Sequence, residues 1–220
     1  MKNALLIITL FAITFFTACE EDLCLQGSGT INEYPLNVNI FSGISLLGPI
    51  NLKVQQGNAQ VVTVEAEPEM YSELTYRVNN EILEIGYEGN VECFDTDFGV
   101  TVNVTVPDIS YISVNGISEI ESVGDLNVET LNLAISGKAD VTLTGSTNAQ
   151  NIDLSGELIA HNFELEVKGL SLDISGLANM EVSCINTLDI EVSGSANIDY
   201  KGSPQITQNV SGSLNLTDKN

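Results

Sequence analysis

Apolar and polar residues alternate along most of the chain after residue 30, in short runs bounded by Gly, Asn or Pro. Clear examples in the first half are INLKVQQG, QVVTVEAEP, LTYRV, ILEIGYEG and VTVNVTVP. Such alternation is typical of half-buried β-strands. No stretch carries an apolar stripe of helical period over the length of a helix, so the pattern predicts an all-β protein.

A second pattern repeats through the C-terminal half, where a Ser-Gly step (Asn-Gly in the first unit) follows the alternating residues. Its glycines are spaced by 21, 19, 20, 18 and 18 residues: Gly116, Gly137, Gly156, Gly176, Gly194 and Gly212. A near-constant period of this length is typical of a solenoid, whose units bury their apolar faces only by stacking. A leucine-rich repeat lacks support, because its Leu-x-x-Leu-x-Leu signature and its helix are absent. The period predicts a parallel β-helix with about 19 residues per coil.

The positions around each step predict the inside and the corner of the coil. The residue before each serine should stack in one interior column, made of Ile135, Leu154, Ile174, Val192 and Val210. The glycines are expected to adopt the positive φ that other residues avoid. Three residues after the glycine, an amide recurs that either forms a ladder between coils or serves only as a turn former: Asn179, Asn197 and Asn215.

Residues 30–107 lack the Ser-Gly step but are equally rich in predicted strands. They are expected to form either the first turns of the same stack or a β-cap on it, with residues 108–216 as the repeat part. No stretch has the composition of a linker, so residues 30–220 are expected to form one continuous domain or two tightly fused lobes.

The N-terminus has the organisation of a secretory signal. Lys2 precedes an apolar run of 13 residues (4–16), and small residues lead to Cys19. The run is shorter than the ~20 residues of a membrane-spanning helix. It resembles a bacterial lipoprotein signal over residues 1–18, in which Cys19 carries the lipid and residues 19–29 form a tether. The alternative is an ordinary signal peptide with an incidental Cys19. The acidic residues after Cys19 are either an export signal to the outer face of the outer membrane or a solvated tether.

The charge restricts the partners. The formal net charge is −23, from 30 acidic and 7 basic residues. Phosphate binding requires clustered Lys and Arg, so we expect no nucleic acid partner and membrane contact only through the anchor. Among the remaining cysteines, Cys24 and Cys93 have polar, Gly- or Asp-containing flanks that favour a disulfide between them in an oxidising compartment. Cys184 lies in the repeat part and is expected to act as a small hydrophobic residue.

Candidate catalytic chemistry is sparse. A single His161 and a single Arg77 build no zinc site and no Ser-His-Asp set, and His161 is expected on the surface. Two residues before successive serines stand Asp153, Asp173 and Glu191, which would stack outward about 4.8 Å apart. Calcium would offset their mutual repulsion, and so would water and salt. The column is therefore either a calcium site or a solvated acidic face, and no other cofactor is expected.

Three segments in order carry a family resemblance: FSGISLLGPINLKVQQG, then VTVNVTVPDISYISVNGISEI, then repeated Ser-Gly-x-Ala-Asn up to Leu216. Together they resemble the auto-transporter adhesin, head GIN domain family. The resemblance implies a right-handed β-helix and an exported protein of a type common in Bacteroidota. The family name suggests adhesion, and the family supplies no catalytic residues to carry over.

The expected function is a non-catalytic binding or adhesion module on a lipid anchor, at the cell surface in the outer membrane. Its partner would be a glycan or a surface or matrix protein. The alternative is a carbohydrate-active β-helix enzyme, a polysaccharide lyase or hydrolase, since paired carboxylates occur on any acidic surface.

Overall fold

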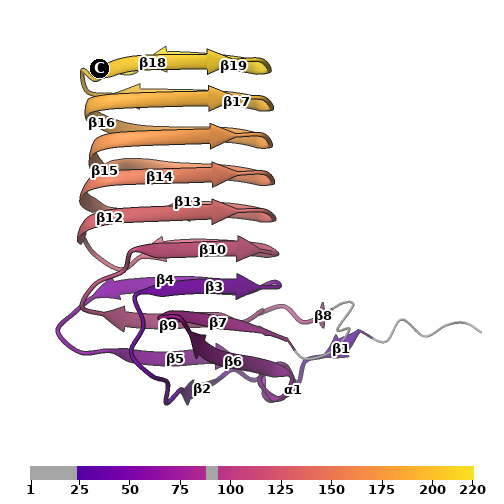
Figure 1. Ribbon diagram of the computed structural model, residues 1–220. Helices are drawn as coiled ribbons and strands as arrows, with labels where there is room; N and C mark the ends of the chain where they lie inside the picture. Colours follow the sequence, from indigo (N-terminus) through magenta and orange to yellow (C-terminus); the bar gives the residue numbers. More distant parts are fainter. Residues whose placement is uncertain (1–23, 88–93) are drawn as a thin grey trace, which may run out of the picture.

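The computed structural model describes residues 24–87 and 94–220, and these are nearly all β-strand (Figure 1). The elements are β1 (Leu25–Gln26), β2 (Asn32–Pro35), β3 (Gly43–Leu47), β4 (Asn51–Gln56), β5 (Val61–Ala66), α1 (Pro68–Ser72), β6 (Leu74–Asn79), β7 (Ile82–Tyr87), β8 (Phe94–Asp95), β9 (Thr101–Val106), β10 (Tyr111–Asn115), β11 (Ile117–Ser122), β12 (Leu126–Ile135), β13 (Lys138–Thr142), β14 (Gly145–Leu154), β15 (Glu157–Ile174), β16 (Leu177–Val192), β17 (Ser195–Lys201), β18 (Gln205–Val210) and β19 (Ser213–Asp218).

The C-terminal part is a β-solenoid in which each coil gives one strand segment before the Ser-Gly step and one after it. The segments before the step stack in parallel from β10 through β12, β14, β15 and β16 to β18. The segments after the step stack from β11 through β13, β15, β16 and β17 to β19. We call the outward side of the first stack face A and that of the second stack face B. The predicted parallel β-helix is confirmed, with a coil spacing of about 20 residues.

The interior column follows the predicted register. Ile135 lies opposite Leu154, Leu154 opposite Ile174, Ile174 opposite Val192, and Val192 opposite Val210. The first four side chains are buried, as expected for apolar groups whose removal from water drives stacking. Val210 is 41% exposed, because it belongs to the last described coil. The predicted burial is thus correct for four of the five positions.

The glycines of the Ser-Gly steps are required by close packing of the corners, and the prediction of positive φ is wrong. Among the described glycines, positive φ occurs elsewhere, as at Gly145 and Gly202. A Cβ on Gly176 would overlap the carbonyl oxygen of Gly156 in the preceding coil. That oxygen accepts a hydrogen bond from the backbone N–H of Leu177 at 2.9 Å. The same clash recurs at Gly137, Gly156, Gly194 and Gly212.

The predicted amide column is present on face B. Asn179, Asn197 and Asn215 lie in register, and Asn197 Nδ2 donates to Asn179 Oδ1 at 3.0 Å. A second amide contact, which sequence reasoning missed, lies on face A, where Asn151 Nδ2 donates to Asn132 Oδ1 at 2.8 Å. Side-chain amides therefore link adjacent coils on both faces.

Residues 24–106, which we call the base, extend the same stack by an interleaved path. β3 pairs in parallel with β10 and β4 with β11; β7 then pairs in parallel with β3, and β9 with β4. An antiparallel layer follows, with β6 on β7, β5 on β9 and β2 on β5. The base thus combines the two expectations. Its parallel strands form the first turns of the stack, and its antiparallel layer forms a β-cap on them. The short helix α1 between β5 and β6 was not predicted.

Glu67, directly before α1, fixes the corner of the base. Its side chain is 1% exposed, and its carboxylate accepts hydrogen bonds from the Gly29 backbone N–H and the Thr96 hydroxyl. A buried carboxylate is costly unless it is hydrogen-bonded, so these donors hold the segment before β2 and the loop after β8 against the corner.

The cysteines divide between the base and the coils. Cys24 directly precedes β1, which pairs in parallel with β8, and it is disulfide-bonded. Its predicted partner Cys93 lies outside the described residues, as does Cys19 with the whole of residues 1–23. Cys184 is a free, buried thiol that donates to the Thr187 carbonyl at 3.0 Å, and burial raises its pKa. In the part of the chain that the structure describes, no helix has the length and hydropathy to cross a membrane.

Candidate binding face

Face A carries two neighbouring columns of outward side chains that run across successive coils. The first consists of Ser45, Ser113, Ala134, Asp153, Asp173, Glu191 and Asn209. The second, two residues earlier on each strand, consists of Tyr111, Asn132, Asn151, Ser171, Asp189 and Thr207. Almost every member ends in a hydroxyl, amide or carboxylate, so the face offers hydrogen-bonding groups at each coil.

Two shallow depressions lie between these columns. One, of about 340 Å³, is bordered by Tyr111, Asn151 and Asp153 among others. The other, of about 290 Å³, is bordered by residues that include Asp189, Glu191, Thr207 and Asn209. Both also have Ser171 and Asp173 in their lining, so the depressions are adjacent and follow the long direction of the stack.

The acidic column predicted from the sequence is present on face A. Asp153, Asp173 and Glu191 stack in register and are all exposed. Within residues 24–87 and 94–220, no three His, Cys, Asp or Glu side chains are grouped so that they could hold a metal ion. Asn209 Nδ2 donates to Glu191 Oε1 at 3.4 Å, so an amide of the next coil contacts the last carboxylate.

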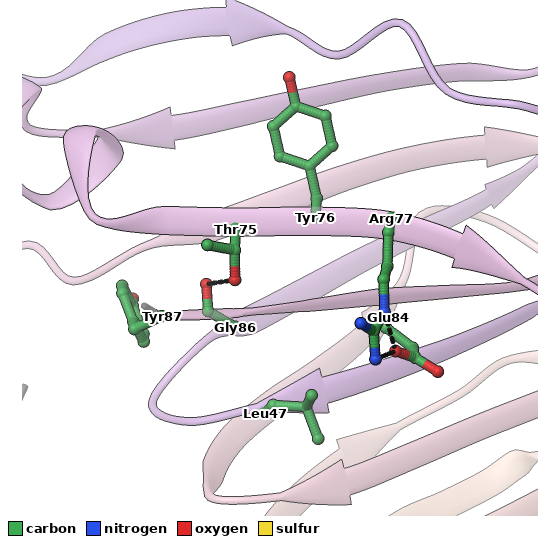
Figure 2. A pocket seen from close by; sticks show the side chains of 7 residues that line it. All are labelled: Leu47, Thr75, Tyr76, Arg77, Glu84, Gly86 and Tyr87. Carbon is green, nitrogen blue, oxygen red and sulfur yellow. Dashed lines mark hydrogen bonds and ion pairs between the residues drawn. The ribbon is translucent and has the colours of Figure 1, made fainter. Parts of the chain in front are cut away.

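At the base, face A ends in a third depression of about 380 Å³, formed by β3, β6 and β7 (Figure 2). Its lining is Leu47, Thr75, Tyr76, Arg77, Glu84, Gly86 and Tyr87. Glu84 lies opposite Ser45, so the depression continues the first column. Gly86 packs closely against Leu47, since a Cβ there would lie 2.8 Å from Leu47 Cβ, and Leu47 itself is 43% exposed. This end of the face therefore offers apolar surface beside polar groups.

An ion pair borders that depression. Arg77 Nη2 lies 2.6 Å from Glu84 Oε2, and Arg77 Nε donates to the same oxygen. The Arg77 side chain is 75% exposed, so water screens the pair and its contribution to stability is below about 1 kcal/mol. Burial raises the pKa of Tyr87, whose hydroxyl donates to the Pro49 carbonyl. Sequence reasoning noted Arg77 as the sole arginine but did not place it in a site.

Face B carries ion pairs between neighbouring coils. His161 Nδ1 lies 3.3 Å from Glu181 Oε2, and both side chains are about half exposed, which confirms the predicted surface position of His161. Lys138 Nζ lies 3.0 Å from Glu157 Oε1 in the register-paired strands. Among the described residues, Glu181 is the hydrogen-bonding partner of His161.

Fold and face together define a class: a β-solenoid with an extended, shallow surface of hydrogen-bonding side chains. The chain belongs to the family described as "Putative auto-transporter adhesin, head GIN domain", which matches residues 40–204. The resemblance seen in the sequence is therefore confirmed.

Several solved structures align with most of this chain. A putative adhesin from Bacteroides fragilis aligns with 19% identity over 88% of this chain and 97% of its own, with a TM-score of 0.61. A putative adhesin from Parabacteroides merdae aligns with 14% identity over 89% and 98%, with a TM-score of 0.47. A putative lipid binding protein from Parabacteroides distasonis aligns with 16% identity over 89% and 99%, with a TM-score of 0.46. No curated protein matches the sequence. At these identities the likeness shows the fold alone.

Proposed function

We propose that the protein is a non-catalytic adhesion or binding module at the cell surface, and that face A binds its ligand. One observation carries the proposal: two in-register columns present Asn, Ser, Thr and Asp side chains across successive coils, at the strand spacing of about 4.8 Å. A regular row of this kind suits an extended polymer, such as a glycan or a segment of a surface or matrix protein. Small substrates are bound in concave pockets that enclose most of their surface.

The charge of face A narrows the ligand class. Asp153, Asp173, Asp189 and Glu191 stand on adjacent coils, and Arg77 at the base is already paired with Glu84. Anionic polymers would meet like charges along the C-terminal half of the face. The ligand is therefore neutral or cationic, and a neutral glycan or a basic protein segment fits best.

We also propose that Cys19 carries a lipid that anchors the protein in the outer membrane. The signal-like residues 1–18 support this proposal. The described chain begins at the base (Figure 1), so an anchor there would let the coils extend away from the membrane, with face A along their side. Cys19→Ser should release the protein from the membrane fraction, whereas an unchanged fractionation would contradict the anchor.

The experiment that separates binding from catalysis is a panel of polysaccharides assayed for turnover and for equilibrium binding in parallel. The proposal predicts saturable binding to at least one neutral polymer and no turnover of any. Asp173→Asn serves as the probe, because its carboxylate borders both depressions of face A. Lyase or hydrolase activity that this variant abolishes would establish the enzyme instead.

A further inference from the structure

The last coil has a neighbouring coil on one side only. Within the described chain, β18 pairs with β16 and β19 pairs with β17, and neither has a strand on its other side. Both strands lie at the end of the stack opposite the base (Figure 1). We call residues 205–217 of this coil the tip. Its outer edges carry rows of backbone N–H and C=O groups without strand partners, which form a template for further pairing.

At the tip, the inward-facing side chains of the interior columns are only partly buried. Ile206, Leu214 and Leu216 are partly buried and Val210 is exposed. Their register partners one coil below are fully buried: Leu188, Val192, Ala196 and Ile198. The tip therefore ends in apolar side chains that one more layer would cover.

The tip also lacks the usual protection of an open edge. Monomeric proteins place charged residues, proline or bulges on such strands. At the base, the outermost strands follow this rule, since β2 contains Glu33 and Pro35 and β6 contains Arg77. From residue 202 to residue 217 the sequence has no charged residue, although the whole chain carries 30 acidic and 7 basic residues.

We propose that the tips of two copies pair, with β18 against β18 and β19 against β19 of the second copy, about a two-fold axis normal to face A. A second copy is the occupant because the uncharged tip is where two chains of net charge −23 can meet without bringing carboxylates together. A two-fold contact uses the same patch twice. It makes each strand pair antiparallel, so inward side chains remain inward and face A of both copies remains on one side.

The tip sequence fits this symmetry in one register. With Gln208 opposite Gln208 of the second copy, Ile206 of each copy lies opposite Val210 of the other, so apolar residues meet apolar residues. Gln208 occupies the interior column that Ile190 fills one coil below, and two facing amides can hydrogen-bond to each other.

The pair of β19 strands fits the same two-fold axis. With Asn215 opposite Asn215 of the second copy, Leu214 lies opposite Leu216. Gln208 and Asn215 stand equally far from the Ser211-Gly212 corner, three residues before it and three after it. One axis can therefore pass both positions, and a single register satisfies both strand pairs.

Tip pairing places the two bases at opposite ends of a rod of double length. If the bases carry lipid anchors, the two copies would stand on separate membranes and the contact would be homophilic adhesion. That consequence rests on the proposed function. The pairing itself does not, and its test on purified protein is independent of membranes and of face A.

The test is sedimentation equilibrium of the purified protein over a wide concentration range, with a matched pair of variants. Gln208→Glu adds a carboxylate to each copy at the axis. Gln55→Glu makes the same change at an exposed residue of β4, away from the tip. For the unmodified protein we expect a reversible equilibrium between monomer and dimer. Gln208→Glu should weaken it at least about tenfold, or 1.4 kcal/mol, while Gln55→Glu leaves it unchanged. A single copy at every concentration, larger assemblies, or equal effects of the two variants would overturn the proposal.

A second measurement covers the case in which Gln208→Glu disturbs the coil. Gln208→Cys should form a covalent pair of chains with a short thiol-reactive linker, because the axis brings the two thiols together. Gln55→Cys should not. Equal yields from the two variants would also overturn tip pairing.

Discussion

The base and the coils above it use the same parallel stacking but reach it by different routes. In the coils, chain order is stack order, and each strand pairs with one 18 to 21 residues away, as Ile112 does with Leu133 and Val192 with Val210. In the base, the layer of β7 and β9 follows β3 and β4 in sequence but lies beneath them, and β2, β5 and β6 run antiparallel to their neighbours. The repeated coils therefore form the long face, and the irregular strands of the base close one end of the stack.

The largest effect should come from the interior column of the coils. Leu154→Ala removes a fully buried side chain and should lower the free energy of unfolding by about 2–5 kcal/mol. Asp153→Ala, next to it on the exposed side, should change it little. Chemical denaturation of both variants checks this, and equal effects would mean that the inward and outward sides are wrongly assigned.

In the base, the corresponding constraint is the disulfide that we propose between Cys24 and Cys93. The pairing of β1 with β8, which directly follow these two positions in the sequence, supports it. Opening a loop of this length should cost about 4 kcal/mol by the loop-entropy account. Unfolding with and without reductant measures the cost, and non-reducing peptide mapping identifies the pair. A map in which Cys93 is not linked to Cys24 would contradict the assignment.

Corner packing should have a somewhat smaller effect. Gly176→Ala forces its Cβ against the Gly156 carbonyl, and overpacking of this kind costs about 1–3 kcal/mol. Gly169→Ala is the matched control, since its Cβ would come no closer than 3.2 Å to the Thr187 hydroxyl and 3.8 Å to the Asn148 carbonyl oxygen, and no positive φ is involved. Thermal unfolding compares the two, and a control as damaging as Gly176→Ala would refute the corner account.

The smallest effect is expected at the ion pair of the base. Arg77→Ala breaks an exposed contact with Glu84, so the loss of stability should stay below about 1 kcal/mol. Salt should reduce it further, because the charges are open to screening. Unfolding at low and high salt tests this, and a large, salt-independent loss would show that Arg77 supports the base through packing.

The coils could be predicted because their information is local and repeated. The Ser-Gly spacing predicted the stack, the interior column from Ile135 to Val192, and the in-register acids Asp153, Asp173 and Glu191. The spacing could not show how closely the corners approach one another, and so the glycines were explained by φ rather than by contact with the preceding carbonyl.

The base could not be predicted to the same depth. Alternation indicates that a segment is a strand but not which strand it pairs with. The alternation in the sequence therefore could not predict the interleaved strand order or the antiparallel layer. The depression at Arg77 depends on that pairing, since it joins β6, β7 and β3. The contact between Asn132 and Asn151 had a signal that was not used, because both stand four residues before the serine of their units.

The central claim, that face A is the binding surface, is tested most directly by an array of glycans and matrix proteins probed with two variants. Ser171→Leu fills the border shared by both depressions of face A without changing the charge. Ser195→Leu makes the same change on face B, in register with Leu177. The account predicts that affinity for the array ligand falls at least about tenfold, or 1.4 kcal/mol, with Ser171→Leu and is unchanged with Ser195→Leu. Binding that survives Ser171→Leu, or that is lost only with Ser195→Leu, would contradict it.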